Sequence, residues 1–383
     1  MRGPLFRILP VLTRQQESIT QMQLFDTIQS MGHEQVVLCS DPVTGLRAIV
    51  AIHDTSLGPA LGGTRMWKYA SDDDAITDAL RLSRGMTYKA AVSGVNLGGG
   101  KAVIIGDSRT EKSESLFRAY GRFVESLRGR YITAEDVGTS VRDMEWIRME
   151  TKYVTGVGGN GGSGDPSPVT ALGVYSGMKA TAKFAWGSDA LAGKRIVVQG
   201  AGNVASFLVR HLTKDGATVF VTDIYEEKAR ALATETGASY IKPEEVFTTA
   251  CDIFSPNALG AILNDETIPN LSCQIVCGGA NNQLKDEQKH AEALRDRSIV
   301  YAPDYVVNSG GLMNVASEVE GYNRDKVMRQ AEGIYDITMN ILTTARDGNM
   351  LTIQASNRIA EDRIRKVRHV HGTYIGSPTI RGV

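Results

Sequence analysis

Three ionisable residues in the first half of the chain stand among glycines and other small residues. Lys89 lies in RGMTYKAA, Lys101 follows three glycines in LGGGKAVII, and Asp136 lies in ITAEDVGT. A lysine acts as a base near neutral pH only where desolvation or a second cation lowers its pKa, so two lysines in one site would have that effect on each other. Two lysines and a carboxylate are residue types suited to general acid–base catalysis.

Each of these residues also has a plainer interpretation when it is taken alone. Lys89 would be a solvated charge that favours the C-terminal end of a helix, and Asp136 would cap a loop. Gly100-Lys101 does not fit a phosphate loop, because Val95 stands at the first glycine of that motif and Ala102 stands where Ser or Thr is needed. We expect Lys101 at the mouth of a strand, with glycines that allow a ligand to approach.

A second pattern begins at Ile196 and has the layout of a dinucleotide-binding βαβ unit. The β-branched run ends in Gly200-Ala201-Gly202, a helical pattern follows, and Thr218–Thr222 lead to Asp223. Gly200 would allow the tight turn, and Gly202 would let a pyrophosphate approach the helix N-terminus. Asp223 would accept hydrogen bonds from a ribose and repel a 2′-phosphate, which favours NAD over NADP. The alternative is a βαβ turn that binds nothing.

The elements around these residues indicate two α/β domains. Before the glycine-rich connection 156–164 we expect strands 35–40 and 46–54 joined by a hairpin, an irregular glycine loop at 58–65, and a helix from Ser71 to about Lys89. After the connection we expect an amphipathic helix 169–186, the doubly wound parallel sheet of a Rossmann-type domain, one long helix 322–346 and a last helix from 353.

The composition excludes several classes of protein. The 383 residues are 42% apolar and 22% charged with a net charge of −1, so no basic field for nucleic acid is present. No apolar stretch reaches the ~18 residues that span a bilayer. The four cysteines are scattered without a zinc pattern, so we expect reduced thiols, no metal and a cytoplasmic protein. Residues 1–21 carry Arg2, Arg7, Arg14 and two prolines, and we expect an irregular extension there.

Eight segments taken together resemble the glutamate/leucine/phenylalanine/valine family of amino acid dehydrogenases. They are GPALGGTRMW (58–67), RGMTYKAA (84–91), LGGGKAVIIGD (97–107), GRYITAEDVGT (129–139), GDPSPVTALGVYSGMKA (164–180), VQGAGNVA (198–205), GANNQL (279–284) and YAPDYVVNSGG (301–311). The resemblance covers nearly the whole chain from about residue 22 to about residue 365. It implies NAD-dependent, reversible oxidative deamination of an L-amino acid to a 2-oxo acid and ammonium.

The resemblance also implies roles for individual residues. Lys89 would pair with the substrate α-carboxylate, Lys101 would activate water, and Asp136 would be the catalytic acid/base. Gly62, Gly63 and Met86 would line the substrate site. The side-chain pocket would be formed by Leu61, Ala134, Leu312 and Val315.

The pocket residues are apolar, so they favour a branched aliphatic side chain such as that of leucine, valine or isoleucine. They offer no cation to the γ-carboxylate of glutamate. Leu312 is bulkier than the Val of many leucine-specific members, which leaves open a preference for valine, or for phenylalanine. An alternative from another class is a non-catalytic NAD-binding sensor.

On the cofactor side the resemblance implies contacts from Thr170, Gly200, Gly202, Asn203, Val204, Asp223, Ala258, Asn282 and Asn308. We expect a substrate-binding and oligomerisation domain of residues 22–156, with the C-terminal helix 352–383 packed back onto it. An NAD-binding domain of residues 157–351 would face it across a cleft. The resemblance further implies a homo-oligomer, either an octamer or a dimer.

Overall fold

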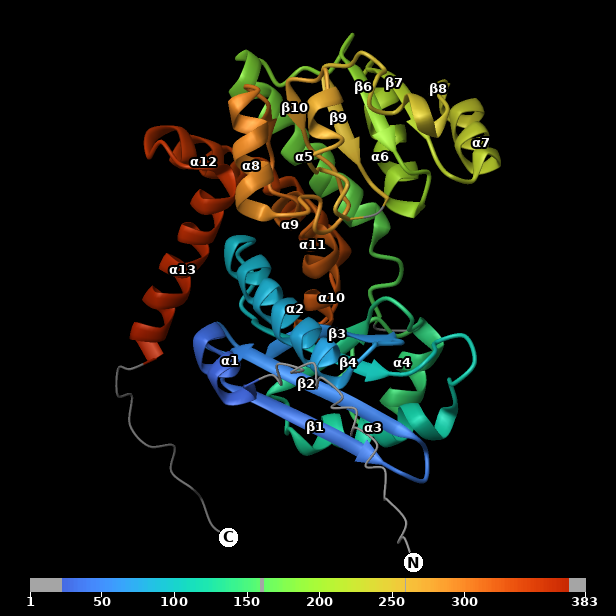
Figure 1. The fold of residues 1–383 in the computed structure, drawn as a ribbon, viewed down its shortest axis with the longest axis vertical. Coiled ribbons are helices and arrows are strands. Elements are labelled where there is room, and N and C mark those ends of the chain that lie inside the picture. The colour runs from blue at the N-terminus through green and yellow to red at the C-terminus, as the bar shows by residue number, and fades with distance from the viewer. Residues whose placement is uncertain (1–22, 159–161, 259, 372–383) are drawn as a thin grey trace, which may run out of the picture.

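The computed structural model describes residues 23–158, 162–258 and 260–371 (Figure 1). The extension expected at residues 1–21 lies outside these ranges. The described residues form two α/β domains, each built on its own sheet, with the second above the first in Figure 1. The predicted fold class, including a Rossmann-type parallel sheet, is confirmed, whereas the residue limits of the domains stay a prediction.

The first sheet is mixed and has the strand order β1-β2-β4-β3-β5. Strands β3, β4 and β5 are parallel, and β2 is antiparallel to both β1 and β4. The strands are β1 (Gln35–Asp41), β2 (Leu46–Asp54), β3 (Ala60–Trp67), β4 (Gly98–Ile105) and β5 (Tyr131–Glu135). The helices are α1 (Leu24–Met31), α2 (Asp72–Val92), α3 (Glu114–Ser126) and α4 (Val141–Arg148).

The two faces of this sheet are covered by different helices because side chains alternate along each strand. Ile49, Ala51 and Val103 pack against α1 and α2. Ala102 and Ile104 instead belong to a core shared with α3 and α4. Lys101 therefore projects from β4 on the side of α2, together with Val103.

The glycines of the first domain lie inside strands, and two expectations are wrong here. Most of the irregular loop expected at residues 58–65 belongs to β3, and Gly98–Gly100 open β4, so Lys101 lies within a strand and not at its mouth. A Cβ at Gly62 would lie 1.6 Å from the Gly100 carbonyl oxygen, and one at Gly99 would lie 2.2 Å from the Thr87 backbone nitrogen. These positions are glycine because neighbouring backbone occupies the space of a side chain.

Helix α2 begins where the sequence predicts, with the Ser71 hydroxyl accepting the N–H of Asp74 at 3.1 Å. It runs one turn further than expected, to Val92, because Ala90, Ala91 and Val92 are buried and extend its packed face. Lys89 therefore lies in the last turn of α2, inside the helix.

The second sheet is parallel with the order β11-β10-β9-β6-β7-β8, so the order reverses between β6 and β9. Its strands are β6 (Arg195–Gln199), β7 (Thr218–Thr222), β8 (Ser239–Tyr240), β9 (Ile253–Pro256), β10 (Ile275–Val276) and β11 (Val300–Tyr301). Its helices include α5 (Ser167–Trp186), α6 (Asn203–Lys214), α7 (Glu226–Thr236), α8 (Glu287–Asp296) and α9 (Asp304–Val307), with 3₁₀ turns η1 (Pro243–Glu245) and η2 (Ile268–Asn270). Ligands of open parallel sheets bind where such an order reverses.

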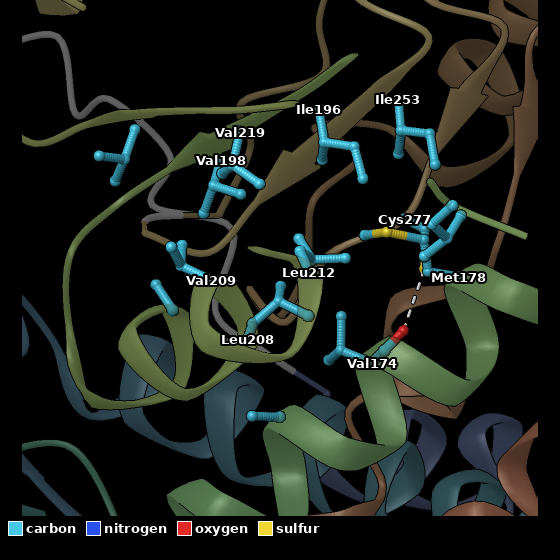
Figure 2. Close-up of a cluster of buried hydrophobic side chains, with 14 of the residues drawn as sticks. Val174, Met178, Ile196, Val198, Leu208, Val209, Leu212, Val219, Ile253 and Cys277 are labelled. Carbon is cyan, nitrogen blue, oxygen red and sulfur yellow. Dashed lines mark hydrogen bonds between the residues drawn. The ribbon is translucent and has the colours of Figure 1, made fainter. Parts of the chain in front are cut away.

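The core of the second domain lies between this sheet and helices α5 and α6 (Figure 2). Val198 of β6, Leu208 of α6 and Val174 of α5 meet there and are fully buried. Helix α5 was expected to be amphipathic, but most of its residues are buried, because it is also covered by α11 (Arg324–Glu332) and α12 (Ile334–Asp347).

The end of the chain returns to the first domain. The long helix expected from 322 to 346 is divided at Gly333 into α11 and α12, and α10 (Gly310–Glu320) precedes them. The last helix, α13 (Thr352–His371), packs against α2. From α13, Arg363 donates to the carbonyl oxygens of Ala91 and Val95, both at 2.9 Å, at the end of α2 that carries Lys89.

Two glycine substitutions test whether the packing of α2 on β4 is as tight as described. Gly99→Ala should destabilise the protein by about 1–3 kcal/mol, because its Cβ would overlap the backbone of α2. Gly85→Ala, on α2 itself, should stabilise it by about 0.5–1 kcal/mol, since a Cβ there meets no atom of the described chain within 4 Å. Thermal unfolding of both variants provides the measurement. Equal midpoints would contradict the packing.

Candidate active site

Lys101 and Asp136 form an ion pair in the first domain. Lys101 Nζ lies 3.1 Å from Asp136 Oδ1, and the exposed fractions of the two side chains are 6% and 23%. Lys101 comes from the middle of β4, and Asp136 follows directly after β5. A Cβ at Gly63 would lie 2.9 Å from Asp136 Cβ. Glycine on β3 is therefore what allows Asp136 to approach.

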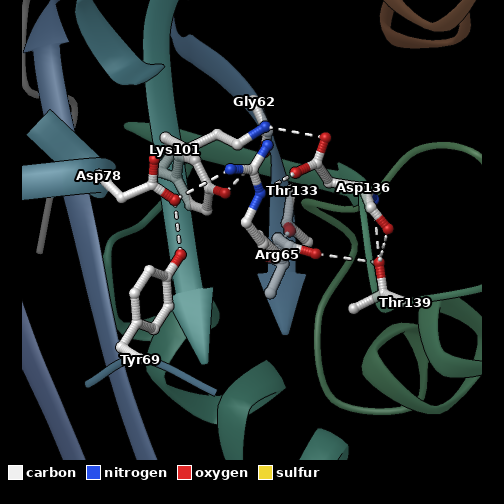
Figure 3. Close-up of polar contacts among 10 residues, drawn as sticks. Gly62, Arg65, Tyr69, Asp78, Lys101, Thr133, Asp136 and Thr139 are labelled. Carbon is white, nitrogen blue, oxygen red and sulfur yellow. Dashed lines mark hydrogen bonds and ion pairs between the residues drawn. The ribbon is translucent and has the colours of Figure 1, made fainter. Parts of the chain in front are cut away.

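The other oxygen of Asp136 is held by an arginine (Figure 3). Arg65 Nε donates to Asp136 Oδ2 at 3.0 Å, and Arg65 also donates to Asp78 Oδ2 at 2.9 Å. The Tyr69 hydroxyl donates to the same Asp78 oxygen at 2.6 Å. The backbone N–H of Asp136 donates to Thr139 Oγ1 at 2.9 Å. Asp136 is thus fixed by contacts to its backbone and to both carboxylate oxygens.

Burial and neighbouring charges shift the pKa of all three proposed catalytic groups. Desolvation lowers the pKa of Lys101, the Asp136 carboxylate opposes that effect, and Arg65 adds to it. Burial would raise the pKa of Asp136, but Lys101 and Arg65 bring it below its usual value. Desolvation lowers the pKa of Lys89 to about 8, against the pull of Asp304 and with a further contribution from Lys101. The pKa of each lysine is therefore closer to neutral pH than the pKa of an exposed lysine.

Lys89 connects the two domains. Its Nζ donates to Asn308 Oδ1 at 2.6 Å, and Asn308 directly follows α9. Asn308 Nδ2 in turn donates to Asn281 Oδ1 at 2.7 Å and to the Gly279 carbonyl oxygen at 3.2 Å. The lysine proposed for the substrate carboxylate therefore lies where the first domain meets the loop after β10.

Four of the residues expected to line the substrate site lie in one apolar cluster. Leu61 and Met86 come from the first domain, and Leu312 and Val315 come from α10. Ala90, Leu97, Ile132, Val95, Tyr153 and Ala316 complete the cluster. Ala134 is buried on β5 opposite Gly63 but lies outside it. The cluster is built by both domains, as a pocket between them requires.

The two glycines of the β6–α6 turn are needed for different reasons. Gly200 has φ +103°, and a Cβ there would lie 3.0 Å from the Asn257 carbonyl oxygen. Gly202 caps α6 with an ordinary φ of −76°, and a Cβ would meet no atom within 4 Å in the residues described. The protein therefore has room at Gly202, beside free N–H groups of α6, and this arrangement fits a pyrophosphate.

Of the remaining residues expected at the cofactor, Asp223, Asn203, Val204 and Ala258 lie at this turn, whereas Thr170, Asn282 and Asn308 lie on other segments. Asp223 Oδ2 accepts the N–H of Ala201 at 2.7 Å, so the carboxylate also fastens the turn. Asn203 and Val204 open α6, and Ala258 is exposed near Gly200. Thr170 is buried on α5, where its hydroxyl donates to the Pro166 carbonyl oxygen, and Asn282 is exposed with φ +52°. Asn308 is the one that touches a proposed catalytic residue.

Sequence reasoning did not select Arg65, Tyr69, Asp78 or Asp304. Arg65 stands inside the GGTRMW segment. The alternation of side chains along a strand places it on the same face of the sheet as Lys101, and this is the feature that could have identified it. That signal is readable only once residues 60–67 are assigned to a strand. Asp304 is buried and accepts the N–H groups of Gln283 at 2.8 Å and Tyr305 at 2.6 Å. It acts on Lys89 through its charge.

Comparison with known proteins establishes the family. Residues 33–153 match the model of the Glu/Leu/Phe/Val dehydrogenase dimerisation domain, and residues 161–225 and 220–372 match the model of the Glutamate/Leucine/Phenylalanine/Valine dehydrogenases. The chain belongs to this family. It is therefore an amino acid dehydrogenase of a group that uses NAD or NADP.

Individual relatives cover nearly the whole chain. Leucine dehydrogenase of Thermoactinomyces intermedius is 54% identical over 92% of this chain and 97% of its own length. Valine dehydrogenase of Streptomyces virginiae is 48% identical over 88% of this chain and 95% of its own. The crystal structure of L-tryptophan dehydrogenase from Nostoc punctiforme has a TM-score of 0.82 at 46% identity, and the match covers 90% of this chain and 99% of that one.

Two further properties concern only the part of the chain that the structure describes. Within it, none of the helices is long and apolar enough to cross a membrane. In the same ranges, three or more His, Cys, Asp or Glu side chains do not gather where they could hold a metal ion.

Alanine at Gly202 should separate cofactor binding from folding in this dehydrogenase. Gly202→Ala should keep the thermal midpoint of the parent and weaken NADH binding by at least about 1.4 kcal/mol, roughly ten-fold in Kd, because the methyl group fills the space left for a phosphate. Gly200→Ala should lower the midpoint as well, since its φ is strained for alanine. Fluorescence titration and thermal melting measure the two effects. Unchanged NADH affinity in Gly202→Ala would place the phosphates elsewhere.

Proposed function

We propose that the chain catalyses the NAD-dependent, reversible oxidative deamination of branched aliphatic L-amino acids. L-leucine, L-valine or L-isoleucine, NAD⁺ and water would yield the 2-oxo acid, NADH and ammonium. The observation that carries this proposal is the convergence of Lys89, Lys101 and Asp136 at the junction of the domains. The leucine and valine dehydrogenases among the relatives support it.

The three residues have distinct tasks in the proposed reaction. The ammonium of Lys89 pairs with the substrate α-carboxylate and fixes the orientation of Cα. Bound NAD⁺ would supply the acceptor for the hydride from Cα, and the residues of this chain would hold the substrate and move its protons. Lys101 in its neutral form takes a proton from the water that adds to the resulting iminium carbon. Its lowered pKa makes that neutral form accessible nearer to neutral pH than for an exposed lysine.

Asp136 is the proposed acid/base at the amino group. Its carboxylate is ionised, because Lys101 and Arg65 lower its pKa, so it can accept a proton from the substrate ammonium. The same group can return a proton to the departing amine when the tetrahedral adduct breaks down. Because the reaction is reversible, Asp136 and Lys101 exchange donor and acceptor roles in reductive amination.

The cofactor would lie along the carboxyl ends of the second sheet. Gly200 and Gly202 would hold the pyrophosphate at the N-terminus of α6, and Asp223 would accept the hydroxyls of the adenosine ribose. The negative charge of Asp223 supports NAD over NADP. Thr170, Asn203, Val204, Ala258, Asn282 and Asn308 complete the proposed contacts.

The apolar cluster around Leu61 and Leu312 is the proposed site of the substrate side chain. Leu61, Met86, Leu312 and Val315 offer only aliphatic or thioether surface, which favours a branched aliphatic group. Ala134 and the Gly62-Gly63 pair are proposed to complete this wall. Whether leucine, valine or an aromatic residue such as phenylalanine is preferred depends on small differences in volume, because one methylene is worth only about 1–3 kcal/mol.

A homo-oligomer is proposed as the functional form. The match of residues 33–153 to a dimerisation domain supports that proposal, and it fits a dimer or an octamer equally. We also propose that residues 22–156 together with residues 352–383, which include helix α13, form the substrate domain, and that residues 157–351 form the cofactor domain.

A substrate panel with two cofactors tests the proposal. The protein should reduce NAD⁺ in preference to NADP⁺ with leucine, valine and isoleucine, and Lys101→Ala should lower kcat by about 10²–10⁴-fold while NADH still binds, because the base is lost. Absorbance of NADH provides the rates. Binding of NADH by the parent protein without turnover of any amino acid would instead indicate a sensor.

Leu312→Val tests the assignment of the side-chain pocket. Removal of one methylene should raise the kcat/KM ratio of leucine to valine by about ten-fold, because the larger side chain gains the space. Val319→Ala is the control. Val319 lies on the same helix, α10, but is 45% exposed, so its truncation should leave the ratio unchanged. If the two variants give the same ratio, Leu312 does not contact the substrate.

A further inference from the structure

A chain of alternating charges runs from the catalytic lysine to the surface of the first domain (Figure 3). It passes from Lys101 to Asp136, then to Arg65 and Asp78, with successive contacts of 3.1, 3.0 and 2.9 Å. Exposure rises along it, from 6% for the Lys101 side chain to 27% for that of Asp78. Every member is an Asp, Arg or Lys held by its neighbour.

The geometry divides the oxygens of Asp136 between two partners. Oδ1 lies toward Lys101, and Oδ2 accepts Arg65 Nε. Arg65 cannot rotate away freely, because its NH1 is bound to Asp78, which Tyr69 also holds. The planar guanidinium therefore spans two carboxylates and fixes the plane of one relative to the other.

We propose that Arg65, itself held by Asp78, is a positioning residue that orients the Asp136 carboxylate and divides its charge between the two cations. The proposal rests on the catalytic roles assigned above to Lys101 and Asp136. Without Arg65, the full charge of Asp136 would act on Lys101 and favour its ammonium form, so less of the neutral base would be present at a given pH. Arg65 thus lets the Asp136 carboxylate serve both as the ion-pair partner of Lys101 and as the acid/base at the substrate amino group.

The charged groups around Lys101 come from each element packed against it. Arg65 lies on β3, Asp78 and Lys89 lie on α2, and Asp136 follows β5, while β2 places the apolar Ala51 opposite Lys101. Arg65 and Lys89 disfavour the charged form of Lys101, whereas Asp136 and Asp78 favour it. Removal of Arg65 and removal of the Asp78 charge should therefore act on Lys101 in opposite directions.

The test is the pH profile of kcat/KM for amino acid oxidation in Arg65→Met, Arg65→Lys and Asp78→Asn. The acidic limb, where Lys101 loses its proton, should move up by about one pH unit in Arg65→Met and down in Asp78→Asn. Arg65→Lys should keep the limb near its parent position and still lose kcat, because a lysine retains the charge but not the fork that spans two carboxylates. Arg47→Met removes the exposed Arg47–Asp72 pair between β2 and α2, and it should match the parent.

A merely structural role of Arg65 would give a different result. It would lower kcat or the thermal midpoint in Arg65→Met and Asp78→Asn alike and leave both limbs in place, and that outcome would overturn the proposal. Acidic limbs that move in the same direction in Arg65→Met and Asp78→Asn would also overturn the proposal. If Arg65→Met does not fold, the limb of Asp78→Asn and the kcat of Arg65→Lys decide the matter.

A second measurement separates this proposal from the proposed function. The rate at which acetic anhydride acylates Lys101, followed by peptide mass spectrometry at a series of pH values, reports its protonation without any turnover. The midpoints should shift in the same opposite directions in Arg65→Met and Asp78→Asn. If the parent oxidises no amino acid but the midpoints still shift, the assigned function fails and the role of Arg65 stands.

Discussion

The ion pair between Lys101 and Asp136 is the interaction on which the site depends. A lysine whose side chain is only 6% exposed loses most of its hydration, and an isolated buried ammonium is unfavourable. The carboxylate supplies the missing partner, but a single carboxylate would also hold the lysine in its charged form. Desolvation lowers the pKa of Lys101 in spite of that carboxylate, and the third member, Arg65, which binds the other oxygen of Asp136, lowers it further. The pKa values of Lys101 and Asp136 therefore depend on each other and on Arg65.

The proposed site also depends on contacts between the two domains. Lys89 is carried by α2 in the first domain, yet its ammonium bonds Asn308 and feels Asp304, both of the second. The apolar cluster likewise takes Leu61 from β3 and Leu312 from α10. A change in how the domains meet would thus alter the environment of Lys89 and the packing of this apolar cluster together. Helix α13 adds to this coupling, since Arg363 binds the last turn of α2 directly.

The sequence predicted the second domain better than the first, and the reason is physical. A βαβ unit is a local pattern, so Gly200, Gly202 and Asp223 could be placed by spacing within about 25 residues. The mixed sheet of the first domain brings together β3, β4 and β5, which are distant in sequence, and β3 was mistaken for a loop because glycine usually disfavours strands. Arg65 was missed for the same reason, since its direction depends on that strand. Lys89, Lys101 and Asp136 could be proposed only because several motifs occurred in one order, and their spacing alone would not have selected them.

The glycines show why residue type alone does not distinguish packing from binding. Gly62 and Gly99 leave space that is filled by the backbone of β4 and α2, and Gly63 leaves space that is filled by Glu135 backbone and the Cβ of Asp136. These glycines contribute to the proposed site indirectly, because they determine where other residues lie. Gly202 leaves space that the described protein atoms do not fill, at the N-terminus of a helix whose dipole favours an anion. Glycine-rich segments that look alike in the sequence therefore differ in the structure: those of the first domain bring the strands together around Lys101 and Asp136, and the one at Gly202 leaves unfilled space at a helix N-terminus.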